Sequence, residues 1–136
     1  MNRRFVIWAA AIAACAGLVT IAGKTRAGLK TSQAVVIVTT PTTRLANADL
    51  GFAHNTANNV EQISCTVSTN TSSASVSCFA RNSEGLTVSC LSTDPDLVAA
   101  ARSLSSDSYL IFRWNDEGQC TNITVRQGSA SRPKAP

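Results

Sequence analysis

The sequence predicts an α+β, β-rich fold, in which an antiparallel sheet of about five to six strands carries one helix packed on one face. Three observations predict it. Short runs of residues alternate between apolar and polar side chains, one segment has the pattern of a capped amphipathic helix, and four cysteines are spread through these elements. The alternation has a period of two, so each run fits a strand with one buried face, and disulfides would staple the strands together.

The first strand pattern is the β-branched run 34–39, which ends before Pro41. The stretch that follows, 41–59, is rich in Asn, Ala, Asp and Gly, and few of its side chains are large enough to anchor a core. Residues of these types are depleted from strands or favour turns. We therefore expect an irregular connection here, with room for a turn of helix.

The alternation is clearest from residue 61 onward. Three consecutive runs place apolar or cysteine side chains on one face: Ile63, Cys65 and Val67; Val76, Cys78 and Ala80; Leu86, Val88 and Cys90. The polar stretches 70–73 and 82–85 between these runs have the composition of turns. We predict a three-strand meander with one cysteine per strand, all on the face that must be covered.

The segment 92–106 has the strongest helix pattern in the chain. Asp94 suits the N-cap, Pro95 suits the first helical position, and Arg102 suits the last turn. An apolar stripe with helical spacing lies between these ends: Leu97, Val98, Ala101 and Leu104. This stripe predicts the helix that covers the meander.

A second hairpin is predicted from 108–114 and 119–126, joined by a turn in which Gly118 suits the left-handed position. Residues 127–136 are small, polar and proline-containing, so a flexible tail is expected there. The span 28–126 is long enough for one domain.

Residues 1–27 have the composition of an export signal. Two arginines precede the 18 uncharged residues 5–22, and a basic segment followed by an apolar run is the pattern of a secretory signal peptide. Small residues before Gly23 and before Gly28 offer two cleavage sites. The domain that remains is expected to be secreted or periplasmic.

Two other interpretations of this segment stay open. As a helix, the uncharged run would be about 27 Å long, just enough to span a bilayer and anchor the chain. The residues Ile-Ala-Ala-Cys ending at Cys15 resemble a bacterial lipobox, in which the cysteine is lipidated after cleavage. All three interpretations export the rest of the chain. A membrane contact is expected only if the segment is retained or Cys15 is lipidated.

The basic character of the chain belongs to its amino terminus. The sequence has 12 basic and 8 acidic residues, but four of the basic residues and none of the acidic ones precede Gly28. From Gly28 onward the two kinds are equal in number, at 8 each. A neutral domain lacks the positive surface that phosphate backbones require, so no nucleic-acid partner is expected.

Cys65, Cys78, Cys90 and Cys120 are expected to form two disulfides, because an even number of cysteines in an exported domain is typical of a disulfide framework. Their spacings of 13, 12 and 30 residues contain none of the close pairs that structural zinc sites use, so neither a metal nor a cofactor is expected. The two hairpin turns place Cys78 opposite both Cys65 and Cys90. The favoured pairing is Cys65–Cys78 with Cys90–Cys120, and the alternative is Cys78–Cys90 with Cys65–Cys120.

No catalytic residue is predicted. His54 is the only histidine, and Asp49 and many serines accompany it, but the Gly-x-Ser-x-Gly motif of a serine nucleophile is absent. A single histidine in an Asn-rich loop is expected to be a solvated surface residue. The acidic pairs have local roles at the helix start and at the hairpin tip: Asp94 with Asp96, and Asp116 with Glu117.

The strand 108–114 carries large side chains on both faces. One face has Leu110, Phe112 and Trp114, and the other has Tyr109 and Ile111. Large apolar side chains are usually buried, so we expect them in the core. The alternative is that one of the two faces forms an exposed recognition patch.

Four short motifs stand out: Ser-Cys at 89–90, Asp-Pro at 94–95, Ser-Asp-Ser-Tyr at 106–109 and Gly-Gln-Cys-Thr at 118–121. With these motifs, the span 51–125 resembles small exported bacterial proteins of uncharacterised function. The resemblance implies an exported protein and carries over no activity, substrate or partner.

The sequence predicts a small exported, non-enzymatic module that is either structural or binds another macromolecule, since no catalytic constellation is filled. Its partner would be a protein or an envelope component that the sequence does not identify. Two alternatives stay open. One is a secreted enzyme inhibitor, because small disulfide domains often present one rigid loop. The other is a small hydrolase that uses His54.

Overall fold

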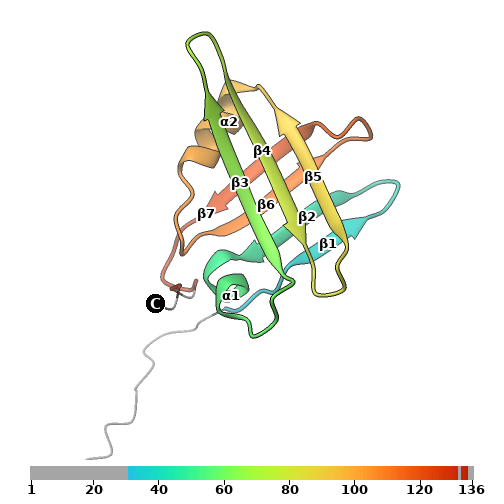
Figure 1. Cartoon of the computed structure of the whole chain (residues 1–136), viewed down its shortest axis with the longest axis vertical. Helices are drawn as coiled ribbons and strands as arrows, with labels where there is room; N and C mark the ends of the chain where they lie inside the picture. Colours follow the sequence, from blue (N-terminus) through green and yellow to red (C-terminus); the bar gives the residue numbers. More distant parts are fainter. Residues whose placement is uncertain (1–30, 132, 135–136) are drawn as a thin grey trace, which may run out of the picture.

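Residues 31–131 and 133–134 are described by the computed structural model of the chain, so the predicted signal segment 1–27, with Cys15, lies outside them. The elements follow one another in the order of Figure 1: β1 (Val36–Thr39), β2 (Arg44–Asp49), α1 (Leu50–Asn55), β3 (Gln62–Thr69), β4 (Ala74–Arg81), β5 (Thr87–Ser92), α2 (Pro95–Arg102), β6 (Tyr109–Trp114) and β7 (Cys120–Arg126). Neither helix in this part of the chain is long and apolar enough to cross a membrane.

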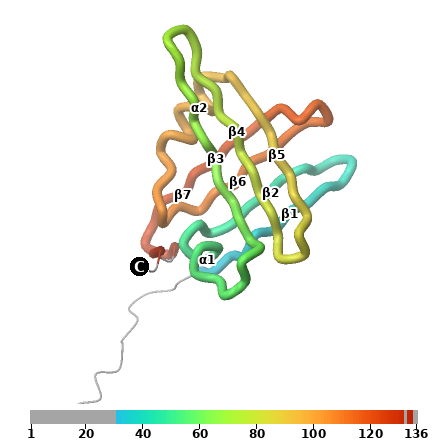
Figure 2. Tube along the Cα trace, in the orientation of Figure 1, coloured from blue at the N-terminus to red at the C-terminus, as the bar shows by residue number. Residues whose placement is uncertain are grey.

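The strands form two antiparallel sheets that stack on each other. The four-stranded sheet has the order β1-β2-β6-β7, and the three-stranded sheet has the order β3-β4-β5. Their strands cross at a steep angle, as the ribbon and the tube both show (Figure 1, Figure 2). The predicted β-rich, antiparallel, disulfide-stapled fold is confirmed. Its strands are divided between two sheets, and a second helix is present in the described chain, where we expected one sheet and one helix.

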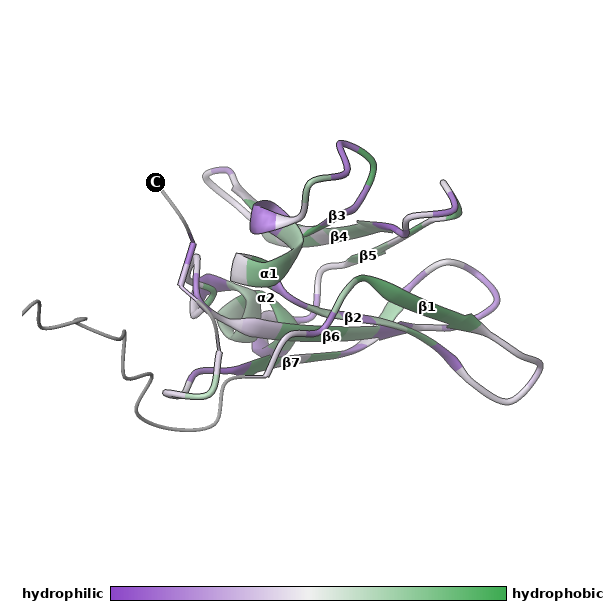
Figure 3. Cartoon of the chain, turned by 90° about the horizontal axis from the view of Figure 1, so that it is seen from below, coloured by the Kyte–Doolittle hydropathy of each residue, from purple (hydrophilic) through white to green (hydrophobic). Residues whose placement is uncertain are grey.

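The presence of two sheets follows from the need to bury the apolar face of each. The inner face of the three-stranded sheet carries apolar side chains, including Val76 and Ala80, and that of the four-stranded sheet carries Leu110 and Phe112. A single short helix cannot remove either face from water, so the two sheets cover each other. Figure 3 shows the sheets as separate layers, with both helices between them at one side.

The predicted meander is present as β3, β4 and β5. Cys78 of β4 lies opposite Cys65 of β3 and also opposite Cys90 of β5. The three cysteines therefore form a row across the sheet. Cys78 and Cys90 are buried and Cys65 is partly exposed, so the row runs along the inner face as the alternation predicts.

Two polar turns connect these strands. In the first, the Asn70 side chain accepts hydrogen bonds from two backbone N–H groups of its own turn. The second contains Gly85, whose φ of 84° lies in the region that favours glycine. Leu86 was expected on the inner face of a strand, and this is wrong. It precedes β5 and is 46% exposed, because its N–H and C=O bond to Asn82 and keep it in the turn.

The stretch 44–49 is strand β2, so the prediction of an irregular connection there is wrong. β2 lies between β1 and β6, with Ala46 opposite Phe112 and Ala48 opposite Leu110. Both alanines are fully buried, because small side chains leave room in the core for their large neighbours. Pairing on both sides outweighs the low strand propensity of the segment. The turn of helix that we allowed for is α1, which directly follows.

Helix α2 starts as its sequence predicts. The Asp94 carboxylate accepts hydrogen bonds from the backbone N–H groups of Asp96 at 2.8 Å and Leu97 at 3.2 Å, and Pro95 occupies the first turn. Val98 and Ala101 are buried. Their face contacts β3, β4 and β7, so α2 covers the meander and also packs against the other sheet.

The second hairpin also has its expected turn. Gly118 has a φ of 75°, and the Asn115 side chain accepts a hydrogen bond from the Gln119 N–H at 2.8 Å. β6 and β7 pair along their length, with an irregularity next to Trp114.

The segment after β7 contacts the domain in its described part. Gln127 donates its side-chain N–H to the Ser103 carbonyl at 2.5 Å, and the Ala130 carbonyl accepts from the Thr31 N–H at 2.9 Å. These bonds connect two residues of the predicted tail to Ser103, after the end of α2, and to Thr31, and the flexibility of the tail stays a prediction.

Candidate functional site

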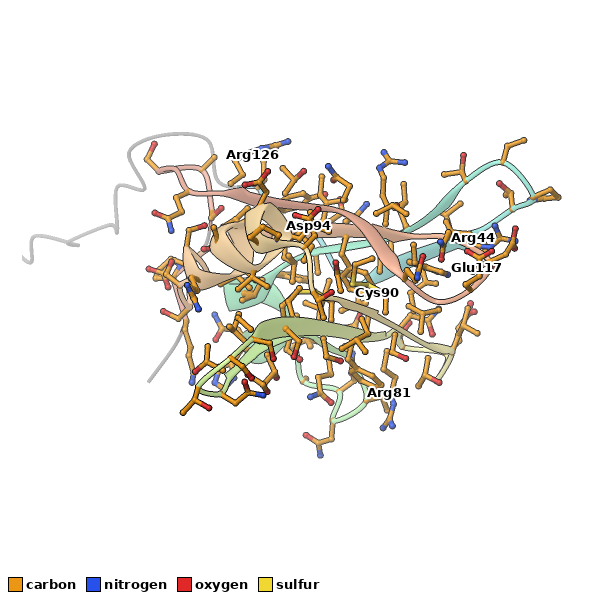
Figure 4. The ribbon with its side chains drawn as sticks, turned by 90° about the horizontal axis from the view of Figure 1, so that it is seen from above. Arg44, Arg81, Cys90, Asp94, Glu117 and Arg126 are labelled. Carbon is orange, nitrogen blue, oxygen red and sulfur yellow. A yellow bond between two sulfur atoms is a disulfide. The ribbon has the colours of Figure 1, made fainter. Side chains whose placement is uncertain are left out.

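The four predicted disulfide cysteines pair in the favoured way. Cys65–Cys78 joins β3 to β4, and Cys90–Cys120 joins β5 to β7 and thereby ties one sheet to the other. Figure 4 places Cys90 between the two sheets. Two structural disulfides in a small domain indicate an oxidising, exported environment.

The same sulfur atoms are the one group of possible metal ligands in the described residues. The Sγ atoms of Cys78, Cys90 and Cys120 lie within 4.8 Å of one another, and no other three His, Cys, Asp or Glu side chains of this part of the chain come so close. Each of these sulfurs is bonded in a disulfide, and a disulfide sulfur is not the thiolate that binds a metal.

His54 lies in a cavity of about 270 Å³ between α1 and the start of β3. Glu61, Ser106 and Lys134 also line it. The cavity therefore holds the three residue types of a serine hydrolase. Within the described chain, however, His54 has no hydrogen bond to either Ser106 or Glu61.

The potential partners of His54 are already engaged. The Ser106 hydroxyl donates to Asp107 at 2.9 Å, and the Glu61 carboxylate accepts from the Val35 N–H at 3.1 Å and from the Asn58 side chain at 2.7 Å. Asp49, the carboxylate nearest in sequence, is fully buried, whereas His54 is exposed. Among the described residues, His54 therefore lacks the contacts with a nucleophile and with a carboxylate that a Ser-His-Asp arrangement requires.

The acidic pairs have the local roles expected of them and one further property. Asp94 caps α2, and Asp116 forms an ion pair with Arg44 of β2. Asp96 and Glu117 are exposed and have no hydrogen bond or ion pair through their side chains to any described residue. The fold brings Asp94, Asp96 and Glu117 to one groove, although they come from segments far apart in the sequence.

This groove, of about 930 Å³, is the larger of the two hollows described here. The end of β5 and the start of α2 form one wall, and the β6–β7 turn with the start of β7 forms the other. Its lining residues are Leu91, Ser92, Thr93, Asp94, Asp96, Leu97, Glu117, Gly118, Gln119, Cys120 and Thr121. We call it the acidic groove, because three of these residues are carboxylates and none is basic.

The walls of the acidic groove are the edges of the two sheets. β5 ends the three-stranded sheet and β7 ends the four-stranded one. They meet at a single parallel bridge, Leu91 with Gln119, in which the Leu91 N–H donates to the Gly118 carbonyl at 3.1 Å. Beyond this bridge the two strands are not paired with each other, so the groove opens between two backbones.

Leu91 adds an apolar surface to this groove. Its side chain is 55% exposed, the most exposed large hydrophobic residue described. An exposed leucine beside three carboxylates suits a ligand that is both apolar and basic.

The aromatic strand β6 divides its side chains between core and surface. Phe112 is fully buried, and its ring centre lies 5.7 Å from that of Trp114, with the two ring planes tilted by 43°. Tyr109 and Ile111 are half-buried on the outer face, where the Arg126 guanidinium covers the Tyr109 ring at 5.1 Å. The expectation of core burial therefore holds for the Phe112 face only. Because Arg126 covers Tyr109, the outer face of β6 is a weaker candidate for a binding surface than the acidic groove.

Sequence reasoning identified the groove carboxylates but explained each of them locally. The signal that unites them is the disulfide Cys90–Cys120, which brings the segments that follow β5 and precede β7 together. Comparisons of this chain with protein-family models, with curated proteins and with solved structures give no match, so the site is interpreted from its own geometry.

Proposed function

We propose that this chain is an exported, non-enzymatic module that binds an extended, basic segment of another exported protein in the acidic groove. In this proposal, residues 1–27 act as a signal peptide and the mature domain is secreted or periplasmic. The observation that carries the proposal is that three carboxylates, an exposed leucine and the meeting ends of two edge strands, β5 and β7, line one groove.

Charge supports a basic partner. Asp94, Asp96 and Glu117 give the groove a negative potential that no lining residue neutralises. Arg44 forms an ion pair with Asp116, the neighbour of Glu117 in the β6–β7 turn. Complementary charge mainly sets the association rate and the choice of partner, and rim carboxylates suit that role.

Backbone geometry supports an extended partner. A free strand edge offers N–H and C=O groups in the spacing of a strand, and an added peptide strand satisfies them. The alternate side chains of such a peptide would point toward Leu91 on one side and toward solvent on the other. A folded or helical ligand would leave these edge groups unpaired.

Titration of defined peptides onto the mature domain tests this proposal. The probes are two labelled peptides of equal length, one alternating Lys with Val and the other alternating Glu with Val, followed by fluorescence anisotropy. We expect the basic peptide to bind and its affinity to fall as salt is raised. Equal binding of the two peptides, or binding of neither, would overturn the proposal.

Two matched pairs of variants locate the site. Leu91→Ser removes the apolar contact and should weaken binding roughly tenfold, whereas Leu86→Ser changes an exposed leucine outside the groove and should not. Glu117→Gln should weaken binding roughly threefold. Glu84→Gln, in the turn between β4 and β5 and outside the groove, should have no effect. Equal effects within either pair would place binding elsewhere.

Export has a separate test, which is the intact mass of the protein recovered outside the cytoplasm. We expect a start near Gly23 or Gly28 and a mass about 4 Da below that of the reduced chain, because two disulfides remove four hydrogens. Full-length chain confined to the cytosol would contradict export. A lipid adduct on Cys15 would instead support the lipoprotein alternative.

The hydrolase alternative depends on the cavity at His54 and lacks the contacts between its side chains described above. The inhibitor alternative is a form of binding in which the partner is an enzyme, and a basic loop on that enzyme would meet the same groove.

A further inference from the structure

The two disulfides lie close to each other, so their sulfur atoms form one cluster. The Sγ atom of Cys78 belongs to the Cys65–Cys78 bond, yet it lies within 4.8 Å of both sulfurs of the Cys90–Cys120 bond. Cys65 is not a member of this close group. The Cys78 sulfur is thus bonded to Cys65 and also lies close to the Cys90–Cys120 disulfide.

The strand registers explain this arrangement. Cys78 lies directly opposite Cys65 on β3 and directly opposite Cys90 on β5. Residues opposite each other in an antiparallel pair have Cα atoms about 4.5 to 5.5 Å apart, which is a distance that a disulfide can bridge. Cys90 is therefore a geometrically permitted alternative partner for Cys78, without any change of strand pairing.

Exposure distinguishes the two ends of the Cys65–Cys78 bond. Cys78 is fully buried, and Cys90 and Cys120 are 4% and 5% exposed. Cys65 is partly exposed on β3, an edge strand of its sheet. Cys65 is thus the most exposed of the four cysteines, so a thiolate from solution reaches the cluster more readily at Cys65 than at the other three sulfurs.

We propose that the cluster is a thiol–disulfide exchange site, in which Cys65 is the point of attack and Cys78 is the internal nucleophile. A thiolate from an exported dithiol protein attacks the Cys65 Sγ, forms a mixed disulfide with it and expels Cys78 as a thiolate. The Cys78 Sγ then attacks the Cys90 Sγ, the Cys78–Cys90 bond forms, and Cys120 leaves as a thiolate. Each step exchanges one S–S bond for another, so no oxidant is needed.

The exchange would change the relation between the two sheets. Cys90–Cys120 ties β5 to β7, and the product bond Cys78–Cys90 lies wholly within the three-stranded sheet. Cys120 lines the acidic groove, so its release would free one wall of that groove from the other. This inference concerns the sulfur chemistry alone and does not depend on the peptide-binding proposal.

Two single variants test the proposal as a matched pair. Cys65→Ser leaves a free thiol at Cys78, beside Cys90–Cys120, and Cys78→Ser leaves a free thiol at Cys65, outside the close group. The mature proteins are held at mildly alkaline pH, alkylated, digested without reduction and analysed by mass spectrometry. We expect C65S to lose the Cys90–Cys120 peptide and to gain Cys78–Cys90 with alkylated Cys120. C78S should retain Cys90–Cys120 with alkylated Cys65.

The wild-type protein supplies a second measurement if either variant fails to fold. It is treated with limiting reduced glutathione and mapped in the same way. Glutathione on Cys65 together with a Cys78–Cys90 peptide supports the proposal. Glutathione first on Cys90 or Cys120, or glutathione on Cys65 with Cys90–Cys120 intact, overturns it, as does a folded C65S protein that keeps Cys90–Cys120 unchanged.

Discussion

The two sheets of this domain are assembled in different ways. In the three-stranded sheet each strand pairs with the next strand of the chain, through two short turns. In the four-stranded sheet β2 pairs with β6, and the whole three-stranded sheet and α2 lie between them in the sequence. Local pairing leaves a pattern that the sequence reveals, and non-local pairing does not.

The sheets also contribute different side chains to the shared core. The three-stranded sheet contributes Ile63, Val76, Ala80 and three cysteines, and the four-stranded sheet contributes the two largest fully buried side chains, Phe112 and Leu110. One disulfide therefore lies within the three-stranded sheet and the other joins the two sheets, and packing of large side chains stabilises the four-stranded sheet. The predictions below test this contrast, beginning with the largest expected effect.

Two phenylalanines give the most direct test. Phe112→Ala in β6 should lower the free energy of unfolding by about 3 to 5 kcal/mol, because the ring is fully buried and the cavity cannot collapse. Phe79→Ala in β4 should cost about 1 kcal/mol, because this ring is only partly buried under the Arg81 guanidinium. Denaturant unfolding measures both values. Equal losses would show that the outer face of the three-stranded sheet is also covered.

Removal of each disulfide measures the covalent contribution. In the double variants the cysteines become serines in pairs, which avoids a free thiol. The loop closed by Cys90–Cys120 spans 30 residues and that closed by Cys65–Cys78 spans 13, so we expect losses of about 3.6 and about 2.9 kcal/mol in the chain-entropy model. The loss on removal of Cys90–Cys120 should exceed that for Cys65–Cys78 by more than the chain-entropy model predicts, because Cys90–Cys120 also joins the two sheets. The opposite order would refute this view of the link.

Local signals in the sequence were sufficient for much of this architecture. The meander follows from alternation around Cys65, Cys78 and Cys90, and the helix start follows from Asp94 and Pro95. The same registers place Cys78 opposite both Cys65 and Cys90, so they left two disulfide pairings open, of which the favoured one is observed. These features depend on neighbours in the chain, and their physical causes lie within a few residues.

The features that were missed depend on distant neighbours. Ala46 and Ala48 have little strand propensity of their own, and they are strand residues because Phe112 and Leu110 of β6 need small neighbours beside them. The acidic groove is a similar case. Glu117 lies in the same groove as Asp94 only because β5 and β7 approach each other in the fold, and no local sequence pattern predicts that approach.

Ala48→Leu tests the role of small residues in β2. The added side chain must fit beside Leu110 in a filled core, and overpacking of this kind costs about 1 to 3 kcal/mol. The control is Ala99→Leu, the same substitution on the exposed face of α2, which should change stability by less than about 0.5 kcal/mol. A tolerated Ala48→Leu would mean that the spacing between the sheets is not set by β2.

The smallest effect is expected at His54, on the short helix that contacts both β2 and β3. His54→Ala should change the free energy of unfolding by less than about 0.5 kcal/mol, because the side chain is exposed and bonds to no described residue. Glu61→Gln is the comparison within the same cavity. It should cost more, about 1 kcal/mol, because the Glu61 carboxylate accepts hydrogen bonds from the Val35 N–H and from Asn58.

Functional assays of His54→Ala also distinguish a binding module from a hydrolase. If the domain binds its partner through the acidic groove, His54→Ala should leave the affinity for the basic peptide unchanged, since His54 lies at the other cavity. A variant that folds normally, keeps this affinity and loses the biological activity of the gene would instead indicate acid–base chemistry at His54. The α1 region, where the two sheets join, would then be the active part of the molecule, and the groove would be secondary to it.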